Sequence, residues 1–567
     1  MKVISLAVFL FLSVWTQTNP SEIIPADAQK AAHSVRPEAI EAHMRYLADD
    51  KLAGRKPGTQ GYELAAQYVE KQFKTLGFKP HGQHGTFRQA VPLRKAQVRE
   101  EASTLALIWD KKEQPLIYGK NFTLSPNFGQ ASSDVSAPIV FVGFGVSAPE
   151  LGYDDYAGMD VRGKIVACFN GAPSSFPPNQ RAFSGSAKQE VAAAHGAVGL
   201  ITFSLPTDIS ARVEANAPRN RQAIYRWTDP QGRAQRTFPQ LRVIASLGDS
   251  TTRALFAKAP KTFEQARLDA SQHKPQAFPM NVSFRAHTQT ELSDGLVGEN
   301  IVGLLPGSDP KLKDEYVVYV SHLDHLGIGR PVKVTSTLGA STPGTPMRGD
   351  SIYNGAHDNA SGVAINLEAA RLFASLPKSP RRSILFVAVT GEEMGLLGSD
   401  YFASNPTVPK DKIVANLCLD MPFFFHPLLD IVPYGSEHSS MKGAVETAAK
   451  FVGVEIASDP IPEQAVFMRS DHFSFVRQGI PAIYIKSGST TGDDRNGTKL
   501  NLAWRATIYH SPQDDMNQPF DWTAAARHVQ LQFLIGYLTA ESNTRPVWNA
   551  GDFFGTKFGL SVATKLK

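Results

Sequence analysis

Cysteine is scarce in this chain. Only two of its 567 residues are cysteines, Cys168 and Cys418, and about 250 residues separate them. A disulfide framework and a zinc cluster held by thiolates are therefore excluded. Any metal ion must be bound by nitrogen and oxygen ligands.

Blocks of like charge and long apolar runs are also missing. The chain has 58 Lys and Arg residues against 53 Asp and Glu residues, a net charge of +5 spread without a basic block. We therefore expect no nucleic-acid partner. Beyond the N-terminus no run of 18 apolar residues occurs, so we expect no stable membrane anchor in the mature protein.

The N-terminus has one short apolar run. Lys2 precedes an apolar stretch over residues 3–15, which is too short to span a bilayer as a helix. The pattern predicts a signal peptide over about residues 1–20, whose cleavage point is uncertain, and a secreted or periplasmic protein. The alternative is an apolar terminus without a targeting role.

The length predicts about two to four domains. Residues 37–78 have helical periodicity, whereas residues 128–280 contain short β runs between Gly, Pro and Ser clusters and little helix. The predicted organisation is a signal peptide at 1–20, a catalytic domain built from 35–127 and 281–545, an inserted β-rich domain at 128–280 and a C-terminal tail at 546–567.

Strand and helix patterns alternate after residue 300. This alternation predicts an α/β fold with a mixed, mostly parallel sheet flanked by helices. The predicted strands cover 316–320, 384–389, 413–419 and 481–485, and the predicted helices cover 362–376 and 524–538.

Charged clusters follow these strands. In an open α/β sheet, ligands bind at the carboxyl ends of the strands, so these clusters should meet at one edge. Imidazole and carboxylate ligands suit zinc, with cobalt or manganese as possible substitutes. The five metal-capable side chains are His322, Asp358, Glu393, Asp420 and His510.

The charges of this set favour two ions over one. Asp358, Glu393 and Asp420 contribute three negative charges, which two divalent ions and a bridging hydroxide would neutralise. Closely spaced ions need a bridging carboxylate, and Asp358 is the natural candidate because its segment, residues 353–362, is rich in turn-forming residues. Signatures of other hydrolases, Gly-x-Ser-x-Gly and His-Glu-x-x-His, are absent.

With these motifs in place, the chain resembles the zinc aminopeptidases with a co-catalytic two-metal site, relatives of bacterial leucyl aminopeptidases and glutamate carboxypeptidase. The inserted region resembles a protease-associated domain, through Gly-Lys-Ile-Val-Ala at 163–167 and Ala-His-Gly-Ala-Val-Gly at 194–199. The family motifs occur in order as Leu-Ala-Gly-Arg-Lys-Pro-Gly-Thr at 52–59, His322-Leu-Asp324, Gly-Ala-His-Asp-Asn-Ala-Ser-Gly at 355–362, Glu392-Glu393, Asp420-Met421 and Tyr509-His510.

The resemblance assigns a role to each matching position. It implies that His322 and Asp420 hold one zinc ion and that Glu393 and His510 hold the other, with Asp358 between them. Glu392 would be the general base. Asp324 and Asp514 would accept hydrogen bonds from metal-binding histidines and fix their tautomers. His325 and His357 adjoin these positions without matching them.

The function implied is that of an exported metal-dependent exopeptidase. It would hydrolyse N-terminal residues from peptides with a two-zinc-activated water. A carboxypeptidase or dipeptidase on the same scaffold is the alternative, because neither an acid that anchors an α-amine nor an Arg that anchors a carboxylate stands out. A non-catalytic, receptor-like binding protein is a further alternative. The oligomeric state is not predicted.

Aromatic residues beside Asp420 suggest a substrate pocket. Phe423, Phe424 and Phe425 follow this predicted ligand directly, and His472 lies in a segment that resembles a family segment near the site. If these rings line a pocket, Leu, Met or Phe should be preferred as the N-terminal residue. The alternative is that they are ordinary core residues.

Overall fold

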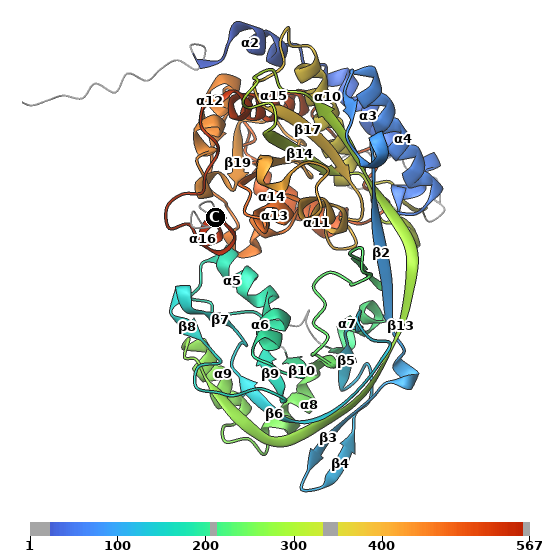
Figure 1. Cartoon of the computed structure of the whole chain (residues 1–567), viewed down its shortest axis with the longest axis vertical. Coiled ribbons are helices and arrows are strands. Elements are labelled where there is room, and N and C mark those ends of the chain that lie inside the picture. Colours follow the sequence, from blue (N-terminus) through green and yellow to red (C-terminus); the bar gives the residue numbers. More distant parts are fainter. Residues whose placement is uncertain (1–22, 204–212, 333–349, 560–567) are drawn as a thin grey trace, which may run out of the picture.

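The computed structural model describes residues 23–203, 213–332 and 350–559. The predicted signal peptide lies outside these residues. Figure 1 shows an upper lobe that contains most of the helices and a lower lobe, linked by two long strands, β2 (Arg88–Val98) and β13 (Ala277–Leu305). In the described part of the chain, no helix is both long and apolar enough to cross a membrane.

Parallel strands form the centre of the upper sheet. β14 lies between β17 and β18, and β21 continues the sheet beyond β18. These strands are apolar runs whose residues are buried on both faces, as expected for a parallel sheet covered by helices. The prediction of these strands is confirmed. Their bounds are Tyr316–His322 for β14, Ser383–Val389 for β17, Ile413–Cys418 for β18 and Ala482–Ser487 for β21.

Antiparallel strands flank this centre, so the sheet is mixed, as predicted. β13 pairs antiparallel with β17 on one side, and β19 pairs antiparallel with β21 on the other. The other strands of this sheet are β1 (Lys79–Pro80), β2, β11 (Ile224–Trp227), β19 (Asp430–Tyr434) and β20 (Glu455–Ile456).

Helices cover both faces of the upper sheet. Along β14, Val317 and Tyr319 face one apolar layer, whereas Val318 and Val320 face the other. The first layer contains α2 (Ala26–His33), α3 (Pro37–Leu47), α4 (Gln60–Thr75), α10 (Ser361–Ala374), α12 (Lys442–Val452) and α15 (Trp522–Glu541). The second contains α11 (Leu397–Ser404), α13 (His472–Val476) and α16 (Phe553–Phe558).

The C-terminal segment packs on the protein. Phe554 of α16 is 1% exposed within the second apolar layer, and the Trp548 indole N–H donates to the carbonyl of Gly479 at 2.9 Å. In its described part, the segment predicted as a tail is therefore anchored in the core.

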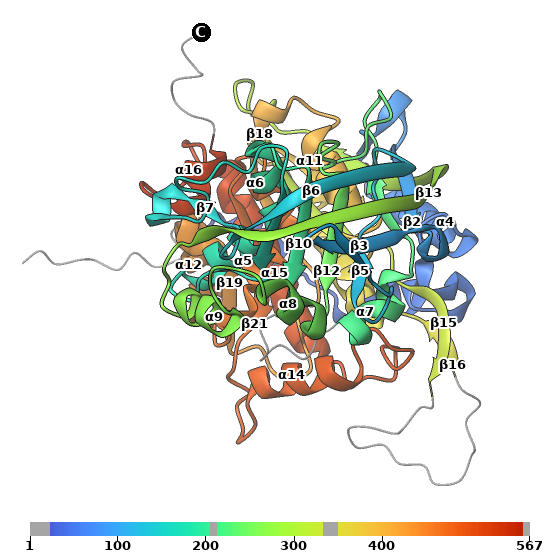
Figure 2. The ribbon, with the colours of Figure 1, turned by 90° about the horizontal axis from the view of Figure 1, so that it is seen from below.

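A second sheet forms the lower lobe, and β13 runs from one sheet into the other. Its first half pairs with β3 and β6, which Figure 2 shows crossing this lobe together with β13. Three strands of this sheet precede residue 128, where the predicted inserted domain begins. The strands are β3 (Thr104–Trp109), β4 (Lys112–Pro115), β5 (Phe122–Leu124), β6 (Ser132–Val142), β9 (Ile165–Phe169), β10 (Gly199–Phe203) and β12 (Val243–Leu247). Two short pairs lie outside both sheets, β7 (Ser147–Ala148) with β8 (Tyr153–Asp154) and β15 (Gly327–Val332) with β16 (Asp350–Tyr353).

The expectation of little helix between residues 128 and 280 was wrong. Helices here are short, and α5, for example, contains Pro, Ser and Gly, which have low helix propensity. Such segments become helical through tertiary packing, as the buried Phe183 of α5 shows. The helices are α5 (Pro178–Ser186), α6 (Lys188–Ala194), α7 (Val213–Asn220), α8 (Asp249–Phe256) and α9 (Phe263–Ser271).

Candidate metal centre

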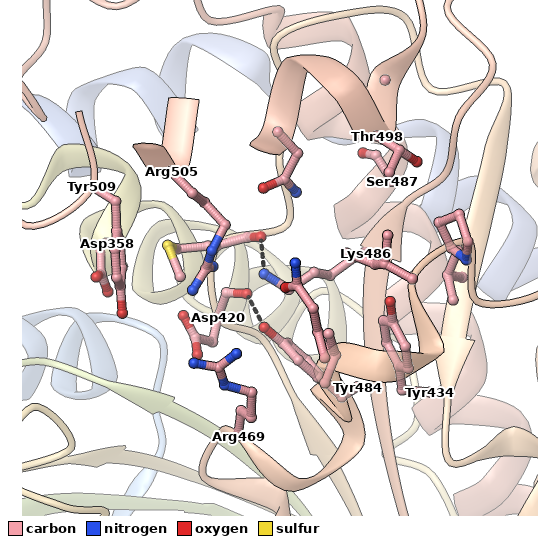
Figure 3. Close-up of a pocket in the computed structure, with 18 of the residues that line it drawn as sticks. Asp358, Asp420, Tyr434, Arg469, Tyr484, Lys486, Ser487, Thr498, Arg505 and Tyr509 are labelled. Atoms are coloured by element: carbon pink, nitrogen blue, oxygen red, sulfur yellow. Dashed lines mark hydrogen bonds between the residues drawn. The ribbon is translucent and has the colours of Figure 1, made fainter. Parts of the chain in front are cut away.

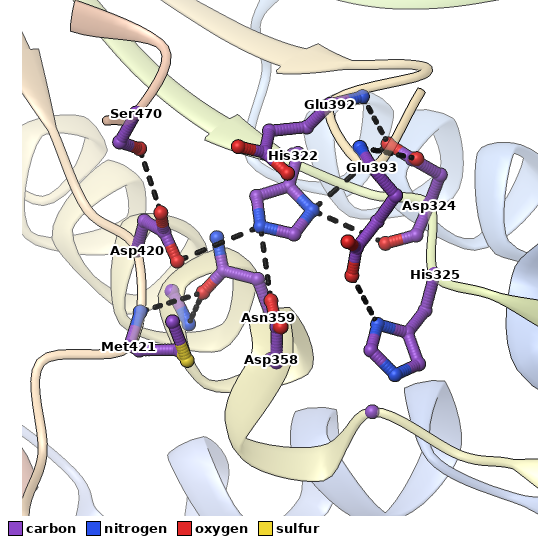
Figure 4. A network of polar contacts seen from close by, with 12 residues as sticks. His322, Asp324, His325, Asp358, Asn359, Glu392, Glu393, Asp420, Met421 and Ser470 are labelled. Atoms are coloured by element: carbon purple, nitrogen blue, oxygen red, sulfur yellow. Dashed lines mark hydrogen bonds and ion pairs between the residues drawn. The ribbon is translucent and has the colours of Figure 1, made fainter. Parts of the chain in front are cut away.

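The predicted ligands meet at the carboxyl edge of the upper sheet. His322 is the last residue of β14, Glu393 lies in the turn after β17, and Asp420 follows β18. Asp358 lies in the turn that leads into α10, and His510 follows α14 (Gly497–Thr507). Because parallel strands end on the same side, residues that are far apart in sequence converge here (Figure 4).

One group of side chains surrounds His322. Its Nε2 atom lies 3.2 Å from Oδ1 of Asp358 and 3.5 Å from Oδ1 of Asp420. All three side chains are buried, and their candidate ligand atoms lie within 4.8 Å of one another. This spacing suits a single cation held between them.

A second group surrounds Glu393. Nε2 of His510 lies 3.0 Å from Oε2 of Glu393 and 3.3 Å from Oδ2 of Asp358. Asp358 therefore faces the first group with Oδ1 and the second with Oδ2. This arrangement is the one that a bridging carboxylate requires.

His325 joins the second group, although it matches none of the predicted ligand positions. Its Nδ1 atom lies 2.6 Å from Oε1 of Glu393, and its side chain is fully buried. With Asp358 and Glu393 it forms a set of candidate ligand atoms within 4.8 Å of one another. The signal that could have found it is the repeated His in His322-Leu-Asp-His325.

The buried polar atoms of both groups fit a bound cation. Several have no hydrogen-bond partner in the described part of the chain, and leaving such an atom unpaired costs about 1–3 kcal/mol each. These atoms are Nε2 of His322, Nδ1 and Nε2 of His325, Oε1 of Glu393, Oδ1 of Asp420 and Nε2 of His510. A divalent ion in each group would satisfy the atoms that lie among its candidate ligands.

The charges of the two groups also fit bound cations. Burial would lower the pKa of His510, but the carboxylates of Asp358 and Glu393 raise it to about 10. Burial would raise the pKa of Asp358, but His322 and His510 hold it well below its usual range. The buried carboxylates are therefore stabilised by nearby positive charge, which either protonated histidines or metal ions supply.

Asp324 has a different role from the one predicted. Nδ1 of His322 lies 3.2 Å from the main-chain carbonyl of Asp324 but 3.9 Å from its carboxylate. The carboxylate instead accepts the main-chain N–H of Glu392 at 3.1 Å and that of Glu393 at 3.4 Å. Asp324 thus holds the Glu392–Glu393 turn, and its carbonyl, rather than its carboxylate, faces the imidazole.

Asp514 also holds main chain. Its Oδ1 atom accepts the N–H of His357 at 2.7 Å, and its Oδ2 atom accepts the N–H of Asp358 at 2.9 Å. Both carboxylate oxygens thus fix the turn that presents Asp358, whereas the prediction was a hydrogen bond from a metal-binding histidine.

Asp420 is positioned by two hydroxyl groups. The Ser470 hydroxyl donates to its Oδ2 atom at 2.7 Å, and the Tyr484 hydroxyl donates to its carbonyl at 2.8 Å. Its Oδ1 atom is left to face His322. Ser470 lies in the segment of His472 and Tyr484 lies on β21, but neither contact with Asp420 was predicted.

A cavity of about 140 Å³ opens beside the metal centre. Asp358, Glu392 and Asp420 line the side next to the sheet, and Arg469, Lys486 and Arg505 also line it. Figure 3 shows the side chains of Arg469 and Arg505 reaching toward Asp420 from opposite sides. The pocket is therefore polar and contains both signs of charge.

Contrary to the prediction, the aromatic cluster does not line this cavity. Phe423 and Phe424 are 3% and 0% exposed, and together with Phe425 they surround the ring of His357, whose centroid lies 4.9 Å from that of Phe425. His472 is also fully buried, and its ring stacks on Tyr484. The packing therefore supports the alternative, in which these rings are ordinary core residues.

Comparison with known proteins identifies the region that contains the site. Residues 300–535 match peptidase family M28. A probable zinc metalloprotease of Phaeosphaeria nodorum is 27% identical over 296 residues, which cover 47% of this chain and 54% of that protein. Leupeptin-inactivating enzyme 1 of Streptomyces exfoliatus is 26% identical over 300 residues, which cover 51% of this chain and 57% of that protein. The chain thus spans about half the length of these curated relatives.

Among solved structures, the aminopeptidase from Aneurinibacillus sp. strain AM-1 aligns with 90% of this chain and 95% of its own, at 19% identity and a TM-score of 0.47. All five predicted ligands and Glu392 lie within the segment that matches the family. The segment that matches peptidase family M28, residues 300–535, thus contains the whole candidate metal centre.

Proposed function

We propose that this protein is an exported metallo-exopeptidase that removes N-terminal residues from peptides. The observation that carries the proposal is the convergence of five metal-capable side chains beside one small cavity, which Asp358, Glu392 and Asp420 line, within the segment that matches peptidase family M28. At about 140 Å³ the cavity is smaller than the roughly 300–1,000 Å³ of pockets for drug-sized ligands, so it suits a single residue.

The residues divide into two metal sites. His322 and Asp420 would hold one zinc ion, Glu393 and His510 would hold the other, and Asp358 would bridge them. When bound, two such ions polarise the substrate carbonyl and lower the pKa of a water molecule so that it attacks near neutral pH. His325 lies against Glu393 and would orient this ligand.

Glu392 is the proposed general base. It belongs to neither set of candidate metal ligands, yet it lines the cavity, and its main-chain N–H is fixed by Asp324. Burial and the carboxylates of Glu393 and Asp420 raise its pKa well above the usual range, which favours proton uptake. Glu392 would take a proton from the attacking water and deliver it to the leaving amine as the C–N bond breaks.

A carboxypeptidase or dipeptidase is the second candidate. The observation that favours it is the presence of Arg469, Lys486 and Arg505 in the cavity, because cationic side chains anchor the free carboxylate of a peptide. Both candidates use the same metal centre. They differ in which end of the peptide enters the cavity.

Chromophore release from free and N-acetylated aminoacyl substrates tests the proposal. An aminopeptidase cleaves only the free substrates, whereas a carboxypeptidase cleaves N-blocked peptides that have a free C-terminus. A zinc-loaded protein that cleaves neither class would contradict the proposed activity and favour a receptor-like binding protein.

Export is the remaining part of the proposal. The apolar run over residues 3–15 supports it. N-terminal sequencing of the protein recovered from the periplasm or medium tests it, and a cytosolic protein with an intact N-terminus would contradict it.

A further inference from the structure

Three basic residues from separate segments share the cavity beside the metal centre. Lys486 lies on β21, Arg505 lies on α14, and Arg469 precedes α13. We propose that they form a carboxylate-binding subsite, so that the enzyme selects substrates with a carboxylate close to the scissile amide. This inference rests on the proposed peptidase function and adds the class of substrate.

Lys486 is the buried member of the subsite. Lys486 is 7% exposed, and its ammonium donates to the carbonyl of Met421 at 3.0 Å. An ammonium has three donors, and no carboxylate forms an ion pair with this one in the described part of the chain. Because a buried ammonium with no carboxylate within ion-pair distance is unfavourable, the position favours a bound anion.

Arg505 is held in place without a carboxylate partner. Its guanidinium lies 4.4 Å from the ring centroid of Tyr509, which itself lines the cavity and precedes His510. Among the residues described, neither Arg505 nor Arg469 forms an ion pair. Stacking on Tyr509 orients the planar guanidinium while leaving its N–H groups available, an arrangement that suits bidentate binding of a carboxylate.

The charge balance of the cavity supports the same conclusion. Two divalent ions would offset the carboxylates of Asp358, Glu393 and Asp420. The positive charges of the three basic side chains would then face the substrate without nearby negative charge to neutralise them. Among its described lining residues, the cavity has no acidic side chain other than Asp358, Glu392 and Asp420. An anionic group on the substrate would restore the balance, whereas a second cation would be repelled.

The position of the subsite limits the source of the carboxylate. Arg469 and Arg505 reach toward Asp420 in Figure 3 and share the cavity with it, so the bound carboxylate would lie close to the amide that is cleaved. Two groups meet this condition. They are the side chain of an N-terminal Asp or Glu and the α-carboxylate of a C-terminal residue.

Matched substrates distinguish these sources. The zinc-loaded enzyme would be assayed with the 4-nitroanilides of Glu, Gln and Leu, and with N-acetylated dipeptides that have either a free or an amidated C-terminus. We expect kcat/KM to favour each carboxylate substrate over its amide at least tenfold in one of the two series. The series that shows this preference identifies the source.

Variants then test the subsite itself. Arg505→Gln and Lys486→Gln should each reduce the carboxylate-to-amide ratio of kcat/KM about ten- to hundredfold, the size expected for a lost charge-assisted hydrogen bond. Lys499→Gln is the matched control, because Lys499 is an exposed cation on the same helix, α14, outside the cavity. It should leave the ratio unchanged. Thermal melts of all three variants would show whether the fold is retained.

The outcomes separate the two hypotheses. Equal cleavage of carboxylate and amide substrates by the wild type, or a ratio that Arg505→Gln and Lys486→Gln leave unchanged, would overturn the subsite and leave the peptidase function intact. Absence of all cleavage would instead overturn the peptidase function. In that case calorimetric titration of the wild type and Arg505→Gln with glutarate would test whether the subsite binds a carboxylate. Equal affinities would overturn the subsite, and a tenfold weaker affinity in the variant would support it.

Discussion

The guanidinium of Arg55 donates a hydrogen bond to the carbonyl oxygen of Gly355 at 3.0 Å. It also donates to the carbonyl of Leu323 at 2.9 Å, so one side chain joins the two turns that present His322 and Asp358. Arg55 lies in a segment rich in turn-forming residues, 52–61, yet it is only 1% exposed. It acts as an internal clamp on the metal centre.

The clamp predicts that Arg55→Lys destabilises the protein and weakens zinc binding. Arg55 also donates to the carbonyls of Leu47 and Asn354, each at 2.5 Å, and a lysine ammonium cannot span four such acceptors. Each buried carbonyl left unpaired costs about 1–3 kcal/mol. Thermal melts and zinc content measured by plasma mass spectrometry would reveal both effects.

Arg45→Lys is the control for this variant. Arg45 is exposed and pairs with Glu41 one helical turn away, so its replacement should change stability by less than about 0.5 kcal/mol. If Arg55→Lys matched this control in melting temperature and zinc content, the clamp would be unimportant.

The adjacent glutamates are predicted to respond differently to the same substitution. Glu392→Gln should reduce kcat on the order of 10²–10⁴-fold with near-normal zinc content, because only proton transfer is lost. Glu393→Gln should lower zinc content, because Glu393 contacts His325 and His510 within the second group. The opposite pattern, with zinc lost from the Glu392 variant, would exchange the two roles.

Much of the upper lobe could be predicted because its parallel strands are short apolar runs. Strands such as β14 and β17 are buried on both faces, and charged residues follow them directly, so their ends are visible in the sequence. The same logic located His322, Glu393 and Asp420. Convergence followed from topology alone, since parallel strands end at one edge of the sheet.

The cavity beside the metal centre could not be predicted in this way. Arg469, Lys486 and Arg505 come from a loop, a strand and a helix, and no short spacing links them. Phe423 and Phe425 were predicted to line a substrate pocket because they lie close to Asp420 in sequence. The chain turns sharply there, with a positive φ at Phe423, and the rings pack around His357.

The roles of the supporting acids also depended on main-chain geometry. Asp324 and Asp514 were expected to bind imidazoles, but both accept N–H groups of the turns that present ligands. A sequence pattern shows which side chains are available, but it does not show which main-chain donors point at them.

Metal removal should abolish activity and lower the melting temperature. The buried carboxylates of Asp358, Glu393 and Asp420 repel one another, and ions bound only to the folded state stabilise it by mass action. We expect about two zinc ions per chain from the two groups of ligands, with activity lost to a chelator and restored by zinc. Full activity in a metal-free preparation would contradict the proposed mechanism.

Ser470→Ala should weaken metal binding without unfolding the protein. The Ser470 hydroxyl fixes Oδ2 of Asp420, and loss of such a partner of a metal ligand typically costs about 10–100-fold in metal affinity or activity. Competition with a zinc chelator would measure the affinity. Ser474→Ala is the matched control, because the Ser474 hydroxyl is also buried but contacts the hydroxyl of Ser399 at 3.0 Å rather than a ligand. Both variants should lose about 1 kcal/mol of stability for the lost hydrogen bond, but only Ser470→Ala should lose zinc. Equal zinc affinities in the two variants would show that Asp420 does not need Ser470 for its orientation.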